Sequence, residues 1–334
     1  MAASPFGEGL SSTRGRVNSS PFSTLQPQAI AEHRIHPKTR PAFIHLRVAS
    51  LARLIPFYQT VLGLQIRHQT KSKVVLGTSE RALVILEQFP QGKRYRGVCG
   101  LYHFALLLPD RRELARVVAR LFALRYPNYP TDHIMTKTTY LDDPEGNTIE
   151  IYCESPEDGV FSLQDGNFFA RRADGSLSDG REPLDLEALF AHLTENDRLD
   201  QPLPPQTGIG HFHLHVASLE QTRTFYHELL GFDDMGIARR FRMGMVSAGG
   251  YHHHIGYNTW QGEGAPPPPA DALGLTAIAF SLPHVEAWND LRRHVTESKL
   301  PVQQEGQTLS LVDPCGIPVL FFPLTENPIS SAVG

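Results

Sequence analysis

HLRVASLARLIPFYQTVLG at residues 45–63 and HLHVASLEQTRTFYHELLG at residues 213–231 are two copies of one pattern, 168 residues apart. In each copy apolar residues alternate up to a valine, Val48 or Val216, as they do in a half-buried β-strand. Apolar residues then recur at helical spacing up to a closing glycine. The chain therefore contains a duplicated unit of strand, helix and turn.

Each copy opens a larger module, because short runs of β-forming residues follow it. A second module follows in each half, at residues 100–125 and 274–295, where a strand pattern again leads into a helix pattern. Both halves close on a turn and a strand, at residues 142–152 and 312–322, where Asp-Pro-x-Gly supplies the turn. These patterns predict an α+β fold of four βαβββ modules in two tandem halves.

The predicted domain boundaries follow from these modules and from local composition. We expect residues 1–37 to be a disordered N-terminal extension, 38–155 the first half with modules 1 and 2, 156–206 a linker with a short helix, 207–325 the second half with modules 3 and 4, and 326–334 a tail.

The composition favours small-molecule chemistry. The net charge is -4 and the basic residues are scattered, so nucleic acid and anionic membranes are not expected partners. The three cysteines, Cys99, Cys153 and Cys315, lie far apart and outside zinc-type spacing, which indicates a reducing compartment. No run approaches the ~20 apolar residues of a membrane span, and residues 1–37 lack the apolar region of a secretory signal. We expect a cytoplasmic protein.

A row of histidines marks the start of the third module. In GHFHLHV at residues 210–216, His211, His213 and His215 alternate with apolar residues, so a strand would place three imidazoles on one face. A solvated sheet face on which histidine is merely tolerated is the competing interpretation. Three imidazoles in register weaken it.

His103 and Glu150 complete a candidate metal site with His211. His103 has the same place on the first strand of its module as His211 has on its own. Glu150 lies between Ile149 and Ile151 in an otherwise apolar strand. If it is buried there, its carboxylate needs a partner or a metal. The competing interpretation is that Glu150 lies exposed on an edge strand. Two histidines and one carboxylate form the facial triad that suits non-haem iron(II), with Mn(II) as the second option.

The repeat provides an internal control for this site. The equivalent positions in modules 1 and 4 hold Phe43, Ala277 and Leu320, none of which can bind a metal. If modules 2 and 3 face each other, we expect one metal per chain, and a vacant cup formed by modules 1 and 4.

Three stretches, GLYHFALLLPDRRELA, IGHFHLHVASL and SAGGYHHHIGYNTWQG, give the chain a likeness to a known superfamily. Over residues 40–325 it resembles the vicinal-oxygen-chelate superfamily of glyoxalases, bleomycin resistance proteins and extradiol dioxygenases, and within it the two-half bacterial catechol 2,3-dioxygenases. Residues 131–150 are similar to the extradiol dioxygenase signature at His133, Tyr140, Asp143, Pro144, Gly146 and Glu150. Thr139 departs from it, since the signature has an apolar residue before the tyrosine.

The resemblance implies extradiol (meta) ring cleavage of a catechol-type substrate by dioxygen at a mononuclear iron(II) site, in aromatic hydrocarbon catabolism. The expected partners are a small aromatic diol and O2. His133 would donate a hydrogen bond and Tyr140 would contact a substrate oxygen. The acid-base histidine of the family falls within residues 252–254: His254 is preferred and His253 is the alternative, while His252 is expected to be a solvated bystander.

Four further residues are candidates for the substrate pocket. His213 and His215 share the predicted face of His211, although exposed imidazoles fit the pattern equally well. Tyr257 and Trp260 could wall an aromatic substrate, but large aromatic residues more often belong to the core.

Two other functions remain open. A glyoxalase-type isomerase with zinc or nickel normally uses two carboxylate ligands, and YHHHIGYN at residues 251–258 offers no acid. A drug-binding resistance protein would have no need for a complete triad. The sequence leaves open the oligomeric state and whether the diol is catechol, an alkyl- or chlorocatechol or a hydroquinone.

Overall fold

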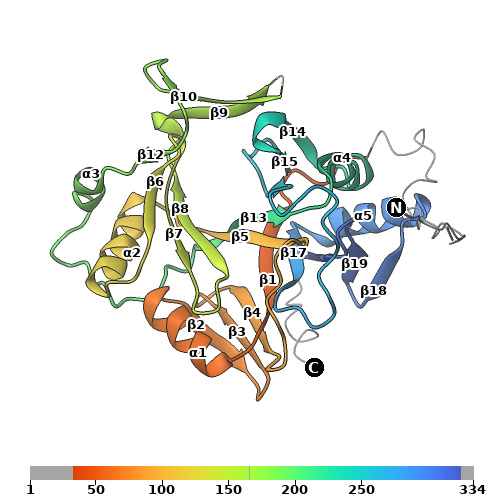
Figure 1. Cartoon of the computed structure of the whole chain (residues 1–334), viewed down its shortest axis with the longest axis horizontal. Helices are drawn as coiled ribbons and strands as arrows, with labels where there is room; N and C mark the ends of the chain where they lie inside the picture. Colours follow the sequence, from red (N-terminus) through yellow and green to blue (C-terminus); the bar gives the residue numbers. More distant parts are fainter. Residues whose placement is uncertain (1–32, 165, 325–334) are drawn as a thin grey trace, which may run out of the picture.

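The computed structural model describes residues 33–164 and 166–324. The fold is α+β and is dominated by two large sheets, as the four βαβββ modules predict (Figure 1). None of the helices in this part of the chain combines the length and apolar character needed to cross a bilayer.

The first large sheet contains modules 2 and 3. Its strands are β5 (Gly100–Leu107), β6 (Tyr129–Asp132), β7 (Thr136–Asp142), β8 (Thr148–Glu154), β12 (Glu182–Pro183), β13 (Gly208–His215), β14 (Asp233–Ala238), β15 (Met243–Ser247) and β16 (Ile255–Asn258). They are ordered β12-β6-β7-β8-β5-β13-β16-β15-β14, and β5 runs antiparallel to β13. One strand of this central pair comes from each half of the chain, so neither half builds the sheet alone.

The second large sheet contains modules 1 and 4. Its strands are β1 (Arg40–Val48), β2 (Gln65–Gln69), β3 (Lys73–Gly77), β4 (Ala82–Gln88), β17 (Gly274–Leu282), β18 (Val302–Glu305), β19 (Thr308–Val312) and β20 (Pro318–Pro323). They are ordered β18-β19-β20-β17-β1-β4-β3-β2, with β1 antiparallel to β17. The tandem halves are therefore units of sequence, whereas each sheet joins one module from each half.

The two helices of the repeated unit begin and end where the repeat predicts. The helices are α1 (Leu51–Pro56) with a π-helical turn at Phe57–Val61, α2 (Arg111–Ala123), α3 (Leu186–Phe190), α4 (Leu219–Arg223) with a π-helical turn at Thr224–Leu229, and α5 (Val285–Glu297). Ser50 and Ser218 cap the two repeated helices, since each side-chain oxygen accepts a backbone N–H three residues on. Gly63 and Gly231 close them with φ of 85° and 80°, a conformation that glycine adopts without strain.

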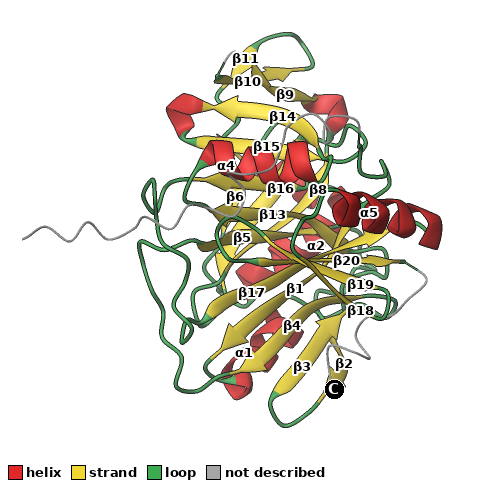
Figure 2. Ribbon diagram, turned by 90° about the vertical axis from the view of Figure 1, so that its right-hand side faces the viewer, coloured by secondary structure: helices red, strands yellow, loops and turns green. Residues whose placement is uncertain are grey.

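The apolar face of β13 joins the two sheets. Phe212 and Leu214 are fully buried on the face opposite to the histidines. Phe212 packs against Phe280 of β17 with ring centroids 5.7 Å apart. In Figure 2 the strands of the first sheet lie above those of the second. Alternation along one strand thus separates the shared core from the histidine face.

The cup of the second sheet is packed rather than vacant, which corrects the sequence expectation. Phe43, Val75, Ile85, Ala279 and Phe322 form a separate buried apolar cluster. The rings of Phe43 and Phe322 stack with centroids 5.9 Å apart. Phe43 occupies the place equivalent to His211, so an aromatic ring fills the space that the imidazoles surround in the other sheet.

The predicted linker at residues 156–206 holds more than the short helix, α3. It also contains a small sheet of β9 (Gly159–Gln164), β10 (Asn167–Arg172) and β11 (Leu177–Ser178), and β12 joins the edge of the first large sheet. Figure 1 shows β9 and β10 reaching from β12 toward β14. We call residues 159–183 the strap.

Residues 1–32 and 325–334, where an extension and a tail are predicted, lie outside the described residues. Residues 33–37, expected to belong to the disordered extension, pack on the second half of the chain. Ile35 is buried, and its N–H donates to the carbonyl of Gly231 at 3.0 Å. The packed part of the chain therefore begins before residue 38.

Candidate metal centre

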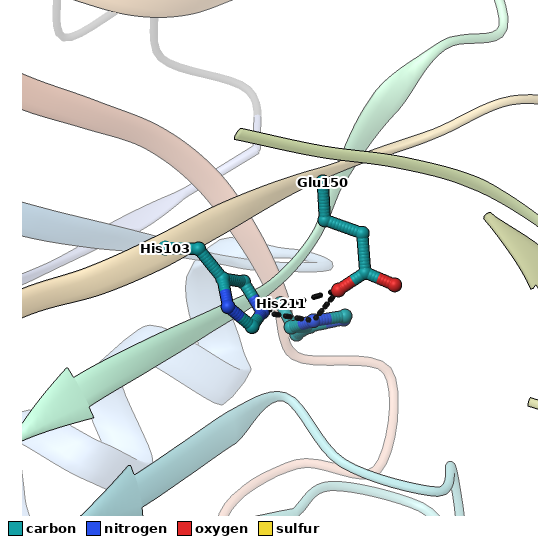
Figure 3. Close-up of side chains that lie close together, drawn as sticks. All are labelled: His103, Glu150 and His211. Atoms are coloured by element: carbon teal, nitrogen blue, oxygen red, sulfur yellow. Dashed lines mark hydrogen bonds and ion pairs between the residues drawn. The ribbon is translucent and has the colours of Figure 1, made fainter. Parts of the chain in front are cut away.

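Three side chains from three strands converge on one point (Figure 3). His103 lies on β5, Glu150 on β8 and His211 on β13. His103 Nε2 lies 3.1 Å from His211 Nε2, and Glu150 Oε2 lies 3.1 Å from each of these nitrogens. All three residues are buried. Three atoms that can each offer a lone pair therefore form an equilateral triangle.

The size of this triangle fits a divalent cation on a facial set of ligands. With 90° between ligands, sides of 3.1 Å place the ion about 2.2 Å from each atom, close to the usual bonds to nitrogen and oxygen. A tetrahedral angle would require about 1.9 Å, which is shorter than zinc–imidazole bonds of about 2.0 to 2.1 Å. The three residues thus fit a metal whose opposite side stays open.

The protonation states near neutral pH also suit a metal. Burial alone would raise the pKa of Glu150, but the neighbouring His211 and His103 outweigh it and hold the pKa well below its usual range. Burial lowers the pKa of His211 to about 4, against the opposing charge of Glu150. A carboxylate and a neutral imidazole are the forms that bind metal ions.

Strand geometry aims these groups at one cavity. On β8, Glu150, Tyr152 and Glu154 lie two residues apart and so share one face. Gly210, next to His211, leaves room for Tyr152, because a Cβ there would lie 1.8 Å from the tyrosine oxygen. The face that carries Glu150 therefore continues along β8 through a tyrosine to a second glutamate.

The triad opens into a cavity of about 890 Å³, within the range of pockets that hold drug-sized ligands. One wall is apolar and aromatic, and its residues include Phe161, Phe168, Met243, Met245 and Trp260. A six-membered ring alone would leave most of this volume empty.

His133 and Tyr140 both line this cavity and contact each other. Both belong to the stretch that is similar to the dioxygenase signature. The Tyr140 oxygen lies 2.9 Å from His133 Nε2, and His133 Nδ1 lies 2.5 Å from the carbonyl oxygen of Gly180 in the strap. A carbonyl can only accept, so His133 Nδ1 carries a proton and, in neutral His133, Nε2 accepts from Tyr140. Burial raises the pKa of Tyr140 well above its usual value, so the phenol stays protonated near neutral pH.

The structure corrects the choice within residues 252–254. His254 does not line the cavity; its Nδ1 accepts the Ala248 N–H at 3.0 Å and lies 3.0 Å from Ser247 Oγ. His253 lines the cavity and lies beside His211, with ring centroids 4.2 Å apart and the ring planes tilted by 45°. The prediction assumed a strand through all three residues. β16 begins only at Ile255, so strand alternation does not apply to the run.

His213 and His215 are joined by Asn258. Asn258 Nδ2 lies 3.0 Å from His213 Nε2, and Asn258 Oδ1 lies 2.8 Å from His215 Nδ1. His213 lines the main cavity, whereas His215 lines a separate pocket of about 230 Å³. The expectation that both histidines line the substrate pocket is therefore wrong for His215.

The two aromatic candidates also differ. Trp260 lines the cavity and donates its indole N–H to the carbonyl of Phe241 at 2.6 Å. Tyr257 is fully buried outside the cavity, where its ring fills the space above Gly244. Tyr257 is therefore a core residue.

Several cavity residues were not predicted from the sequence. Phe161, Phe168, Gly180 and Arg181 line it from the strap, and Tyr102 lines it from β5 beside His103. The two adjacent phenylalanines in NFFARR of β10 were the available signal for a strand. This strand has no counterpart in the repeat, so the repeat gave it no place in the sheet.

The first comparisons with known proteins concern sequence. A family model described as Glyoxalase/Bleomycin resistance protein/Dioxygenase superfamily matches residues 40–151. The protein named Catechol-2,3-dioxygenase of Bacillus subtilis (strain 168) is 36% identical over 283 residues, which cover 84% of this chain and 95% of that relative. The likeness thus extends over both halves of the chain.

Comparison with solved structures supports the fold alone. A candidate dioxygenase from Bacillus subtilis subsp. subtilis str. 168 superimposes with a TM-score of 0.57 at 14% identity, covering 88% of this chain and 87% of that one. Glyoxalase I from Zea mays gives a TM-score of 0.49 at 16% identity, covering 85% and 92%.

Proposed function

Because this chain belongs to the Glyoxalase/Bleomycin resistance protein/Dioxygenase superfamily, we propose that it is a metal-dependent dioxygenase that opens the ring of a catechol-type diol beside its two hydroxyl groups. The single observation that carries the proposal is the triangle of His103, Glu150 and His211 at the base of a large cavity. Its open side leaves room for small oxygen ligands.

His103, Glu150 and His211 would hold the ion, which we propose to be iron(II), with Mn(II) as the second option. When bound, iron(II) supplies the redox chemistry that lets a diol react with dioxygen. Both oxygen atoms enter the product, so the reaction consumes one diol and one O2 and needs no external reductant.

The surrounding residues would position the substrate and handle its protons. Tyr140, held by His133, faces the triad and would hydrogen-bond a substrate oxygen. His253 lines the cavity beside His211 and would accept a proton from a diol hydroxyl and return it to the opened product. Trp260 and the apolar wall would pack on the ring and exclude water.

The cavity volume favours a substituted ring. About 890 Å³ exceeds what an unsubstituted diol fills, and the wall that includes Phe161 and Met245 is apolar. An alkyl- or chlorocatechol therefore fits this space better than catechol. We propose a small apolar aromatic diol and O2 as the partners of this site.

The isomerase alternative requires a second carboxylate ligand. Among the described residues, the group that could hold a metal contains Glu150 as its one acid. Glu154, the next acid along β8, instead accepts hydrogen bonds from Tyr251 and His252. No feature of the site favours the isomerase or the drug-binding alternative.

The test is anaerobic loading with iron(II), followed by catechol or 3-methylcatechol and air. We expect the yellow absorbance of a ring-opened semialdehyde and one iron per chain. Glu150→Gln should abolish both. His45→Gln is the matched control, because His45 has the place of His213 in the other sheet and pairs there with Glu87 at 3.0 Å. Iron binding without product would argue against ring cleavage, and absence of metal binding would overturn the triad.

A further inference from the structure

We propose that Glu154 and His252 are positioning residues that fix the tautomer of His253, with its Nδ1 protonated and its Nε2 lone pair left for the cavity. The catalytic consequence rests on the proposed function. Which atom donates and which accepts in each hydrogen bond is argued from geometry alone and does not depend on that function.

His253, His252 and Glu154 are linked by a continuous series of hydrogen bonds. His253 Nδ1 lies 2.7 Å from His252 Nδ1, and His252 Nε2 lies 3.2 Å from Glu154 Oε1. The side chain of His252 is only 5% exposed, whereas that of Glu154 is 33% exposed. His252 is therefore buried between the cavity and a carboxylate that reaches solvent, and the expectation of a solvated bystander is wrong.

The direction of each hydrogen bond follows from the carboxylate. An ionised Glu154 can only accept, so His252 Nε2 must carry the proton of that bond. In a neutral imidazole the other nitrogen is then a lone-pair acceptor, which makes His252 Nδ1 the acceptor for His253. His253 Nδ1 must then carry its proton, which leaves Nε2 unprotonated.

Two tyrosines stabilise the same arrangement of donors and acceptors. Tyr251 donates its hydroxyl to Glu154 Oε1, and the Tyr152 oxygen lies 2.6 Å from the Tyr251 oxygen. With Tyr251 donating to the carboxylate, Tyr152 donates to Tyr251. Tyr251 and His252 both donate to Glu154 Oε1, and all the hydrogen bonds then run toward this residue.

His253 is the member of this hydrogen-bond series that reaches the cavity. His253 lines the cavity, and its Nε2 has no hydrogen-bond partner among residues 33–164 and 166–324. A base that accepts a diol proton needs a lone pair on the atom that faces the substrate. Because one imidazole nitrogen carries the proton and the other accepts, only the Nδ1–H tautomer supplies it.

The tautomers can be measured without any activity. The full chain, labelled with ¹⁵N-histidine and free of metal, is recorded by long-range ¹H–¹⁵N correlation spectroscopy, which distinguishes Nδ1–H from Nε2–H. We expect Nδ1–H for His253 and Nε2–H for His252. Glu154→Ala, at a part-exposed position, should reduce the Nδ1–H fraction of His253. Nε2–H for His253 in the unmodified chain would overturn the proposal, whatever the enzyme does.

Kinetics test the consequence. His252→Leu should lower kcat about 10- to 100-fold, the usual loss when a supporting hydrogen bond is removed, with KM and iron content unchanged. His252→Gln should restore most of kcat, since its amide can accept from His253 and donate to Glu154. His254→Gln is the matched control, because His254 lies outside the cavity, and its kcat should not change.

The outcomes separate the two proposals. Unchanged kcat and an unchanged His253 tautomer in His252→Leu would overturn the positioning role. If the unmodified chain shows the expected tautomers but cleaves no diol, the proposed function fails and the hydrogen-bond order stands.

Discussion

His103 Nε2 and His211 Nε2 lie 3.1 Å apart, although the two residues are 108 positions apart and come from opposite halves of the chain. The antiparallel pairing of β5 with β13 brings them together. Each nitrogen also lies 3.1 Å from Glu150 Oε2. A cation between the three atoms would bind all of them at once, whereas direct contacts alone leave the nitrogens of His103 and His211 sharing one carboxylate oxygen.

We therefore expect divalent metal to stabilise the fold. Iron(II) or Mn(II) added under anaerobic conditions should raise the unfolding temperature with increasing concentration. The free energy of unfolding should rise by about 2.7 kcal/mol when free metal is 100 times its Kd. Differential scanning calorimetry measures the effect. Glu150→Gln should lose it, and an equal rise in this variant would place the metal elsewhere.

Removal of the Tyr140 hydroxyl should impair turnover but not metal binding. The Tyr140 oxygen is held 2.9 Å from His133 Nε2 at the cavity. Tyr140→Phe should lower kcat by about 100-fold, the lower end of the range for a positioned proton-transfer group. Tyr126→Phe is the control, because the Tyr126 hydroxyl binds the carbonyl of Asp142 outside the cavity. An equal loss of activity in both variants would contradict a specific role.

Gly180 should be intolerant of a side chain. It has φ of 70°, and a Cβ there would lie 2.8 Å from the Phe168 ring. Gly180→Ala should cost about 1 to 3 kcal/mol of stability from backbone strain and should also raise KM, because Phe168 and the carbonyl that holds His133 must move. Urea unfolding and steady-state kinetics measure the two effects.

Gly175→Ala provides the matched control for Gly180→Ala. Gly175 has φ of 88° with no atom within 4 Å of the added Cβ. It should show the backbone cost alone, and its kinetics should be normal. If Gly175→Ala impaired KM as strongly as Gly180→Ala, the contact of the strap with His133 would not be the cause.

Asp313 makes stability depend on pH. Burial, opposed by the backbone N–H groups of Ile317 and Cys315, raises its pKa from 3.8 to about 6. A raised folded-state pKa contributes stability that is present below about pH 4 and lost as the pH rises through about 6. The difference corresponds to about 3 kcal/mol. The uncharged side chain of Asp313→Asn avoids this loss.

The free energy of unfolding of Asp313→Asn, relative to that of the unmodified chain, should therefore increase by about 3 kcal/mol between pH 4 and pH 8. Urea unfolding at the two pH values measures it. Asp290→Asn is the control, since Asp290 is exposed and pairs with Arg293. Parallel pH curves for the unmodified chain and Asp313→Asn would refute the prediction.

The repeat made the fold and the triad predictable. A constant offset between the halves identified equivalent strands, so Phe43 and Leu320 marked the sheet that cannot bind metal, and His103 and Glu150 marked the sheet that can. Strand alternation then predicted which side of β13 carries imidazoles. Both inferences depend on regular, duplicated elements.

The remainder of the site lies where the chain is irregular. His252 and His253 precede β16, so alternation could not decide which imidazole faces the cavity. Gly180 and Arg181 belong to the strap, which has no second copy. Contacts such as that of His133 with the Gly180 carbonyl depend on tertiary packing, and no local pattern encodes them.

The pairing of β5 with β13 also determines when the site can form during protein synthesis. His103 and Glu150 emerge from the ribosome first, but the sheet that holds them is complete only after β16 ends at Asn258. At about 5 to 20 residues per second, Glu150 waits roughly 5 to 20 s for the rest of its sheet, and His103 waits longer. Until β13 has emerged, β5 lacks the partner strand that carries His211, so the triad can form only after both of these strands have been made.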